Sequence, residues 1–153
     1  MVAYNFKQRF IAPIRRGLGD GHKVPPSTRP KLQTIRAPRN RHAMPGEQVQ
    51  LYYGMRTKEC FLIGKAICTA VPKISMSFVS GAGLDEHVIV EDVGHLSSAS
   101  HLDQFSRLDG FEDWVEMKQF WAQEHPGSYV FDGVLVRWKP FIVVASIYPD
   151  PPA

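Results

Sequence analysis

The sequence predicts an α+β fold in which a small, mostly antiparallel β-barrel or strongly curved sheet is flanked by helices. Three observations lead to this prediction. Short segments with alternating apolar residues recur along most of the chain, separated by turns that contain glycine or proline. One later segment has the apolar spacing of an amphipathic helix. The 153 residues are 44% hydrophobic, which suits a single domain with a core of its own.

The expected strands are short runs rich in β-branched and aromatic residues. They cover residues 2–6, 33–37, 48–53, 59–71, 74–79, 86–90 and 129–138. The clearest is 48–53, where Val49, Leu51 and Tyr53 fall on one face. A further apolar run at 141–148 is interpreted as an edge strand or as a contact between two copies of the chain.

Two helices are expected, a short one at 10–17 and a longer one at 112–123. The longer helix has an apolar stripe at positions i, i+3, i+6 and i+7, formed by Trp114, Met117, Phe120 and Trp121. These aromatic side chains are therefore assigned to the core. Asp109 and Glu112 have the spacing of a capping box, so one interpretation of Asp109 is a helix cap.

Charge is distributed unevenly along the chain. Residues 1–60 hold 12 of the 18 Lys and Arg but 3 of the 15 Asp and Glu, a net charge of +9, and the remainder carries −6. A concentrated positive field attracts anions and supplies most sequence-independent affinity for nucleic acids, which favours RNA or a nucleotide as partner. The alternative is that these basic residues balance the acidic half across the folded surface.

The sequence contains no apolar run long enough to span a membrane, and its start lacks the layout of a signal peptide. We therefore expect a cytoplasmic protein that does not bind a membrane. Cys60 and Cys68 form no CxxC pair, and both are interpreted as buried free thiols.

The most informative segment is Lys31-x-x-Thr34-x-Arg36, which continues into Arg39 and Arg41. Lysine supplies a compact charge whose pKa shifts on desolvation, threonine a hydroxyl that orients or reacts, and arginine a planar fork for oxyanions. Together they suit a phosphate-bearing or nucleoside-like ligand. The alternative is that the threonine is an ordinary strand residue and the arginines a solvated face.

The order of these residues resembles the signature of the ASCH family, small domains of the PUA-like superfamily. In that family a Gly-x-Lys-x-x-Thr-x-Arg-like segment precedes a Gly-Asp or Gly-Glu turn, here Gly46-Glu47, and the resemblance covers roughly residues 4–138. It implies a PUA-like barrel, an association with RNA and, in the amidohydrolase members, removal of the acetyl group from N(4)-acetylcytidine. We therefore expect one ASCH-like domain over 1–153 that binds RNA or a modified nucleoside, with the oligomeric state left open.

The resemblance implies that Lys31, Thr34 and an acidic residue carry out this hydrolysis. The acid falls on Asp109, where the family usually has a glutamate before Gly-Phe. On this hypothesis Lys31 is the base, Thr34 is the nucleophile or orients water, and Asp109 is the acid or base for the leaving amine. Arg36 would bind an oxyanion or a phosphate.

The chain also departs from the family pattern in three places. Arg29 stands where the motif has its glycine, and residues 18–30 form an inserted loop, interpreted as surface decoration or as a lid. Residues 139–153 form an extra C-terminal segment that the resemblance does not explain.

Two alternative functions remain. In a non-catalytic RNA-binding module, Lys31, Arg36, Arg39 and Arg41 would bind phosphates and Tyr53 or its neighbour Tyr52 would stack on a base. In a ribonuclease, His42 would act with the lysine as acid and base.

We expect no cofactor and no metal. His87, Glu91 and His95 lie in a strand-like context that is expected to keep them apart, and Ser100, His101 and Asp103 are expected in a polar loop.

Overall fold

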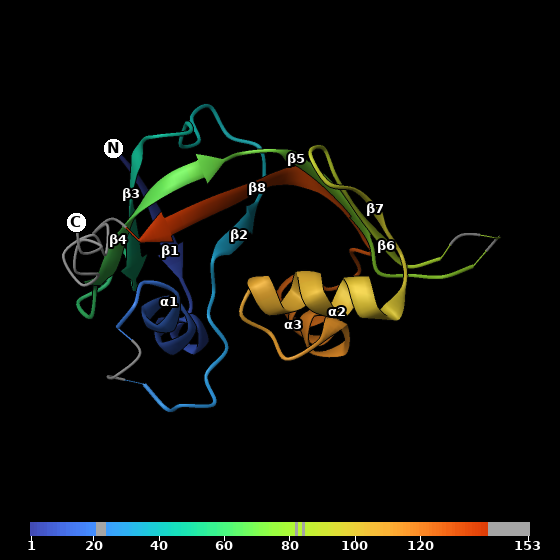
Figure 1. Ribbon diagram of the computed structural model, residues 1–153, viewed down its shortest axis with the longest axis horizontal. Coiled ribbons are helices and arrows are strands. Elements are labelled where there is room, and N and C mark those ends of the chain that lie inside the picture. The colour runs from blue at the N-terminus through green and yellow to red at the C-terminus, as the bar shows by residue number, and fades with distance from the viewer. Residues whose placement is uncertain (21–23, 82, 84, 141–153) are drawn as a thin grey trace, which may run out of the picture.

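The computed structural model describes residues 1–20, 24–81, 83 and 85–140, and in that part of the chain eight strands form one curved sheet with three α-helices on its concave side (Figure 1). In chain order the elements are β1 (Val2–Phe6), a 3-10 turn (Gln8–Phe10), α1 (Ile11–Gly17), β2 (Gln33–Arg36), β3 (Gln48–Tyr53), β4 (Phe61–Ala70), β5 (Lys73–Ser77), β6 (His87–Val90), β7 (Gly94–Leu96), α2 (Ala99–Leu108), α3 (Trp114–Glu124) and β8 (Val130–Pro140).

The strands follow the order β1-β3-β4-β8-β5-β6-β7, and β2 pairs with β8 beside this path. All pairs are antiparallel except β1 with β3. The long strand β8 is paired on both edges, because Val134 is the partner of Lys73 in β5 and of Arg36 in β2. The expected α+β class and mostly antiparallel sheet are confirmed. The pairings between the described strands do not close the sheet, so it is strongly curved and open, and the expected closed barrel is not observed.

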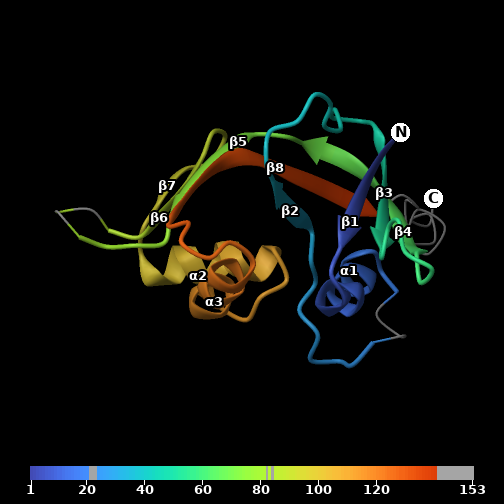
Figure 2. The same ribbon diagram turned by 180° about the vertical axis from the view of Figure 1, so that it is seen from behind.

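The helices lie in two groups beneath the sheet. Helix α1 lies below the end formed by β1, β3 and β4, and α2 and α3 lie below the end formed by β5, β6 and β7 (Figures 1 and 2). The chain that leads into β2 passes between the two groups. Buried apolar residues from the sheet and from the helices form one core, including Tyr4, Ile14, Leu51, Met76, Met117 and Leu135. This arrangement brings the start of β2 into the middle of the concave side.

The expected strands and the first helix agree with the structure to within two residues at most ends. Helix α2 and the short strand β7 were not predicted, and the prediction of a polar loop around Ser100, His101 and Asp103 was wrong, because these residues lie in α2. Ser98 caps this helix by accepting a hydrogen bond from the backbone N–H of His101 at 3.1 Å. The helix buries Leu102 and Phe105, which lie three residues apart on one face, while polar residues occupy most of the other positions.

Helix α3 begins two residues later than predicted, and its apolar stripe is confirmed. Asp113 is its N-cap, and the carboxylate accepts a hydrogen bond from the backbone N–H of Glu116 at 2.9 Å. The interpretation of Asp109 as the cap of this helix was therefore wrong. Asp109 instead follows the last residue of α2, and its side chain is available for another role.

Three other expectations can be compared with the structure. Both cysteines are free, but Cys60 is exposed and only Cys68 is buried, so the prediction of two buried thiols was wrong for Cys60. Within the described ranges, no helix is both long and apolar enough to cross a membrane. The apolar run expected at 141–148 lies outside the described residues.

Candidate functional site

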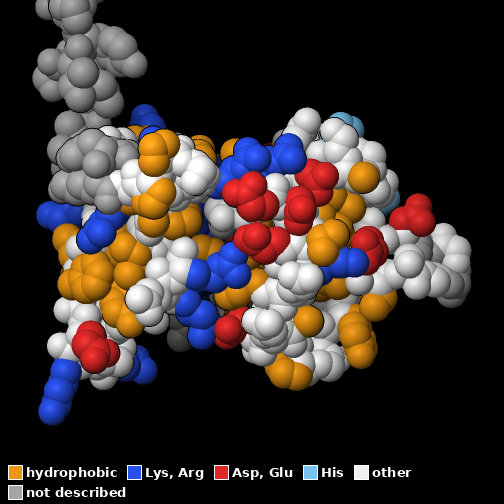
Figure 3. All heavy atoms as spheres, turned by 90° about the horizontal axis from the view of Figure 1, so that it is seen from below, with side chains coloured by type: hydrophobic (Ala, Val, Ile, Leu, Met, Phe, Trp, Pro, Cys, Tyr) orange, Lys and Arg blue, Asp and Glu red, His pale blue; other side chains and the backbone are white. Residues whose placement is uncertain are grey.

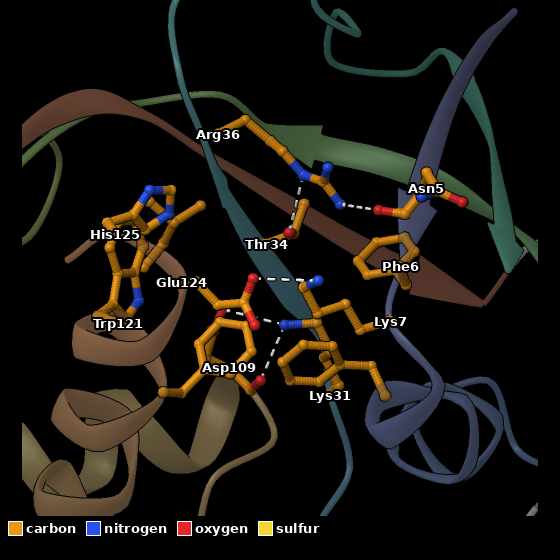
Figure 4. A pocket seen from close by; sticks show the side chains of 13 residues that line it. Asn5, Phe6, Lys7, Lys31, Thr34, Arg36, Asp109, Trp121, Glu124 and His125 are labelled. Carbon is orange, nitrogen blue, oxygen red and sulfur yellow. Dashed lines mark hydrogen bonds and ion pairs between the residues drawn. The ribbon is translucent and has the colours of Figure 1, made fainter. Parts of the chain in front are cut away.

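A cavity of about 240 Å³ opens on the concave side, between the start of β2, the end of β1 and the end of α3. Figure 4 shows its labelled side chains pointing toward one another, with Asp109 reaching it from the end of α2. Its lining residues are Asn5, Phe6, Lys7, Phe10, Lys31, Thr34, Ile35, Arg36, Asp109, Phe120, Trp121, Glu124 and His125. Four residues of the predicted site, Lys31, Thr34, Arg36 and Asp109, are thus brought together although Asp109 is far from the others in sequence.

The backbone around Lys31 is fixed from both sides. The N–H of Lys31 donates to the carbonyl oxygen of Pro13 at 2.8 Å, and the N–H of Leu32 donates to the carbonyl of Leu108 at 2.9 Å. A Cβ at Gly17 would lie 2.3 Å from the carbonyl oxygen of Lys31, so only glycine permits this approach of α1. The lysine is therefore held between α1 and the end of α2.

The Lys31 side chain is 2% exposed and extends into the cavity. Its Nζ donates a hydrogen bond to the backbone carbonyl of Asp109 at 2.8 Å, lies 3.3 Å from Asp109 Oδ1 and is 4.4 Å from the centroid of the Phe10 ring. Burial lowers the pKa of Lys31 to about 8, although the charge of Asp109 opposes this shift. A substantial fraction of the amine is therefore neutral just above physiological pH.

Asp109 is 5% exposed and is positioned by a tight turn. Gly110 has a φ of 94°, a left-handed conformation that glycine adopts without strain, and it turns the chain away directly after Asp109. Burial raises the pKa of the Asp109 carboxyl, an effect that the nearby Lys31 charge opposes. Among the described residues, Asp109 Oδ1 accepts no hydrogen bond of good geometry. A buried carboxyl group of this kind suits proton transfer better than the stabilisation of a fold.

Thr34 and Arg36 form the next part of the cavity wall. Arg36 Nε donates to Thr34 Oγ1 at 3.1 Å, and a terminal nitrogen of Arg36 donates to the carbonyl of Asn5 at 2.7 Å. Because the Thr34 oxygen accepts from a cation, its own proton remains free to be donated to a base. Burial lowers the pKa of Arg36 to about 10, well above neutral pH, so the guanidinium keeps its charge there.

The remaining wall was not predicted from sequence. Lys7 Nζ and Glu124 Oε2 form an ion pair of 3.0 Å, and both line the cavity. His125 packs against the Trp121 ring with the centroids 4.8 Å apart. Trp121 was assigned to the core, which is correct, but it also lines the cavity. The charged residues at the end of α3 belong to no sequence motif, so their position at the cavity is seen only in the folded structure.

The other predicted binding residues lie away from the cavity lining. Arg41 forms an ion pair with Glu47, and Tyr53 packs against Phe61 with ring centroids 5.4 Å apart. Arg39 lies over the Tyr4 ring.

His42 is occupied by structural hydrogen bonds. Its Nδ1 lies 3.0 Å from the Tyr4 hydroxyl and its Nε2 lies 2.9 Å from the carbonyl of Ala37. It does not line the cavity, so it lends no support to the ribonuclease alternative.

Four of the 12 basic residues in positions 1–60 form ion pairs with acidic residues in the rest of the described chain. Basic and acidic side chains are intermixed over the middle of the face seen from below (Figure 3). The N-terminal half supplies Arg9 and Arg29, which pair with Glu116 and Glu112 in the C-terminal half. Arg36 is different, because it forms no ion pair with a carboxylate in the part of the chain that the structure describes.

Within residues 1–20, 24–81, 83 and 85–140, no group of three or more His, Cys, Asp or Glu is arranged to hold a metal ion. The expectation that His87 and His95 lie apart was wrong, because the β6–β7 pairing brings their rings to 5.1 Å between centroids. Two histidines without a third ligand do not form a site of the usual kind.

The cavity therefore combines a lysine with a lowered pKa, a threonine hydroxyl, a buried carboxyl group and a partly buried guanidinium. Such groups can accept a proton and return it to a leaving group. A hydroxyl can attack a carbonyl carbon or orient a water that attacks it, and a cation can stabilise the resulting oxyanion. Comparison of the chain with family models, with curated proteins and with solved structures found no match.

Proposed function

We propose that the chain is a cytoplasmic ASCH-type domain with a PUA-like sheet, and that it hydrolyses the amide bond of an N-acetylated cytidine. One observation carries the proposal: the buried Lys31, with its pKa lowered to about 8, shares a cavity with Thr34, Asp109 and Arg36. A buried amine paired with a carboxyl group stabilises a fold weakly, whereas the same pair beside a hydroxyl suits acid and base catalysis.

The size of the cavity fits a nucleobase and its substituent. At about 240 Å³ it is smaller than the roughly 300–1,000 Å³ of sites for drug-sized ligands. Its wall combines aromatic side chains, including Phe6 and Trp121, with a larger number of polar and charged side chains. Such a lining suits a flat base that carries an amide.

In the proposed reaction the neutral Lys31 amine removes a proton from the Thr34 hydroxyl, or from a water that this hydroxyl orients. The oxygen forms a bond to the acetyl carbon, and Lys31, which is now protonated, stabilises the negative charge that develops on the carbonyl oxygen. The C–N bond then breaks, and the amine of cytosine takes a proton from Lys31 or Asp109. Where Thr34 is the nucleophile, a water then hydrolyses the acetyl ester that Thr34 carries. Either route consumes one water and gives cytidine and acetate.

The test is incubation of the purified protein with N(4)-acetylcytidine, with cytidine release followed by chromatography. Lys31→Met, Thr34→Val and Asp109→Asn each remove one proposed group at similar size. Exposed residues provide matched controls, namely Lys65→Met, Thr69→Val and Asp85→Asn.

We expect the three cavity variants to lose at least about a hundredfold in kcat/KM, the lower end for acid–base catalysis, and the controls to keep the wild-type rate. Full activity in Lys31→Met, or no cytidine release by the wild type, would contradict the proposal. Binding without hydrolysis would favour the RNA-binding module instead, for which the uncompensated charge of Arg36 is the supporting observation.

A further inference from the structure

Two arginines meet on the ring of one tyrosine beside the cavity. The guanidinium carbon of Arg39 lies 4.5 Å from the centroid of the Tyr4 ring, and that of Arg36 lies 5.3 Å from the same centroid. Arg36 also lies 4.7 Å from the centroid of Phe6, which lines the cavity. Aromatic faces attract guanidinium groups and hold their planes in place. Both positive groups are thus positioned against the same ring by packing.

The charge of this pair is not neutralised within the described parts of the chain. Neither Arg36 nor Arg39 forms an ion pair with a carboxylate there, whereas Arg9, Arg29 and Arg41 each do. Arg36 donates to Thr34 and to the carbonyl of Asn5, and Arg39 donates through Nε to the carbonyl of Arg41. The terminal nitrogens of Arg39 form no hydrogen bond with a described residue, so their N–H groups are available to a ligand.

The pKa of Arg36 is consistent with this geometry. It is lowered to about 10, first by burial and also by the neighbouring charge of Arg39, while Tyr4 and Asp109 oppose the shift. Burying one guanidinium next to another costs free energy unless an anion joins them. An anion with several oxygens can bind both planar groups at once.

The position of Arg36 indicates how a ligand extends. In the view of the cavity, Arg36 lies at the end away from Lys31 and Asp109, and Thr34 lies between them (Figure 4). A ligand whose reacting amide lies near Lys31 therefore has its far end near Arg36. In a nucleotide, the phosphate is at the far end from the exocyclic amine of the base.

We propose that Arg36 and Arg39 form a phosphate subsite, so that the ligand is a phosphorylated cytidine rather than the free nucleoside. The phosphate is either that of a mononucleotide or a phosphodiester of RNA, and the identification of the base rests on the proposed function. Arg41 is not part of this subsite, because Glu47 already pairs with it.

The test compares the binding of cytidine with that of its 5′- and 3′-monophosphates by isothermal titration calorimetry, at low and at high salt. We expect the wild type to bind one monophosphate at least about tenfold more tightly than cytidine, and we expect added salt to reduce this preference. In Arg39→Gln the preference should fall to about twofold or less. Arg39 is exposed, so this substitution should leave folding intact, which thermal denaturation checks.

The matched control is Arg29→Gln, which removes the same charge from an arginine that is already paired with Glu112. It should keep the preference for the monophosphate. Equal affinity of the wild type for cytidine and both monophosphates, the absence of monophosphate binding at millimolar concentration, or an equal loss in the control would overturn the inference.

Two further measurements separate this inference from the proposed function. Phosphate-dependent binding without hydrolysis of N(4)-acetylcytidine or its monophosphates would support the subsite and contradict the amidohydrolase. Hydrolysis at the same rate and affinity with and without a phosphate on the substrate would support the amidohydrolase and contradict the subsite. The source of the phosphate is tested by measuring binding of a short single-stranded oligocytidylate. If the protein binds it more tightly than the monophosphates, and Arg39→Gln reduces this affinity, the ligand is RNA. If the protein binds it more weakly, the ligand is the mononucleotide.

Discussion

Replacing both members of the buried pair, Lys31→Met together with Asp109→Leu, distinguishes a catalytic pair from a structural one. The pKa of Lys31 falls from its ordinary 10.5 to about 8, even with Asp109 beside it. At about 1.4 kcal/mol per pKa unit, this shift corresponds to roughly 3 kcal/mol against the folded, charged form at neutral pH. Apolar side chains of similar size remove this cost.

The loss of a buried hydrogen bond opposes this gain in stability. The Lys31 amine donates to the backbone carbonyl of Asp109 at 2.8 Å, and methionine leaves this carbonyl without that partner. An unsatisfied buried acceptor costs about 1–3 kcal/mol. The double variant should therefore be between equally stable and about 2 kcal/mol more stable than the wild type. Lys31→Met alone should be less stable by about 3 kcal/mol, because it leaves a buried carboxylate without its cation.

Urea denaturation at pH 7 measures these differences, with the fluorescence of the buried tryptophans as the signal. If the pair is catalytic, the double variant should be at least as stable as the wild type and lack activity. A double variant that loses more than about 2 kcal/mol with an unchanged m-value would show that the pair holds the fold together, and the catalytic interpretation would lose its main support.

Four further predictions concern the residues in and around the cavity. If neutral Lys31 is the base, kcat/KM should rise with pH around a midpoint near 8. NMR titration of its amine should give a lower pKa in Asp109→Asn, which lacks the charge that favours the protonated form; an unchanged pKa would refute the coupling. Gly17→Ala places a Cβ 2.3 Å from the Lys31 carbonyl oxygen and should cost about 1–3 kcal/mol in urea denaturation, whereas a variant as stable as the wild type would show that this contact is not tight. Glu124→Gln breaks a partly exposed ion pair with Lys7 and should change stability by less than about 1 kcal/mol in the same assay, a larger loss indicating that the pair closes the cavity structurally.

The fold was predictable where the residue pattern is strong and local. Strand 48–53 and the apolar stripe of α3 were found because alternation and helical spacing are visible within a few residues. Helix α2 was missed because Leu102 and Phe105, whose three-residue spacing marks its buried face, stand among serine, histidine and aspartate residues that are also typical of loops. That the sheet is open could not be predicted either, because this depends on which strands, far apart in the sequence, pair with one another.

The site was predictable only in part, for a related reason. Lys31, Thr34 and Arg36 share one short motif, and Asp109 was located through its Gly-Phe context. Their common cavity agrees with that prediction of position, and their chemical roles remain predictions. Lys7, Glu124 and His125 carry no motif, and they reach the cavity because β1 and α3 converge on the start of β2.

The close contact between Gly17 and Lys31 also bears on how this site can change during evolution. The contact and the hydrogen bond from Lys31 to Pro13 fix both ends of the segment 18–30 at one point of the structure. Once the ends of a loop are held together, doubling its length costs only about 0.6 kcal/mol in closure entropy. Insertions and deletions at this point are therefore inexpensive, and they leave the lysine in place. Variation in the length of this segment is thus separated from the geometry that holds Lys31 in the cavity.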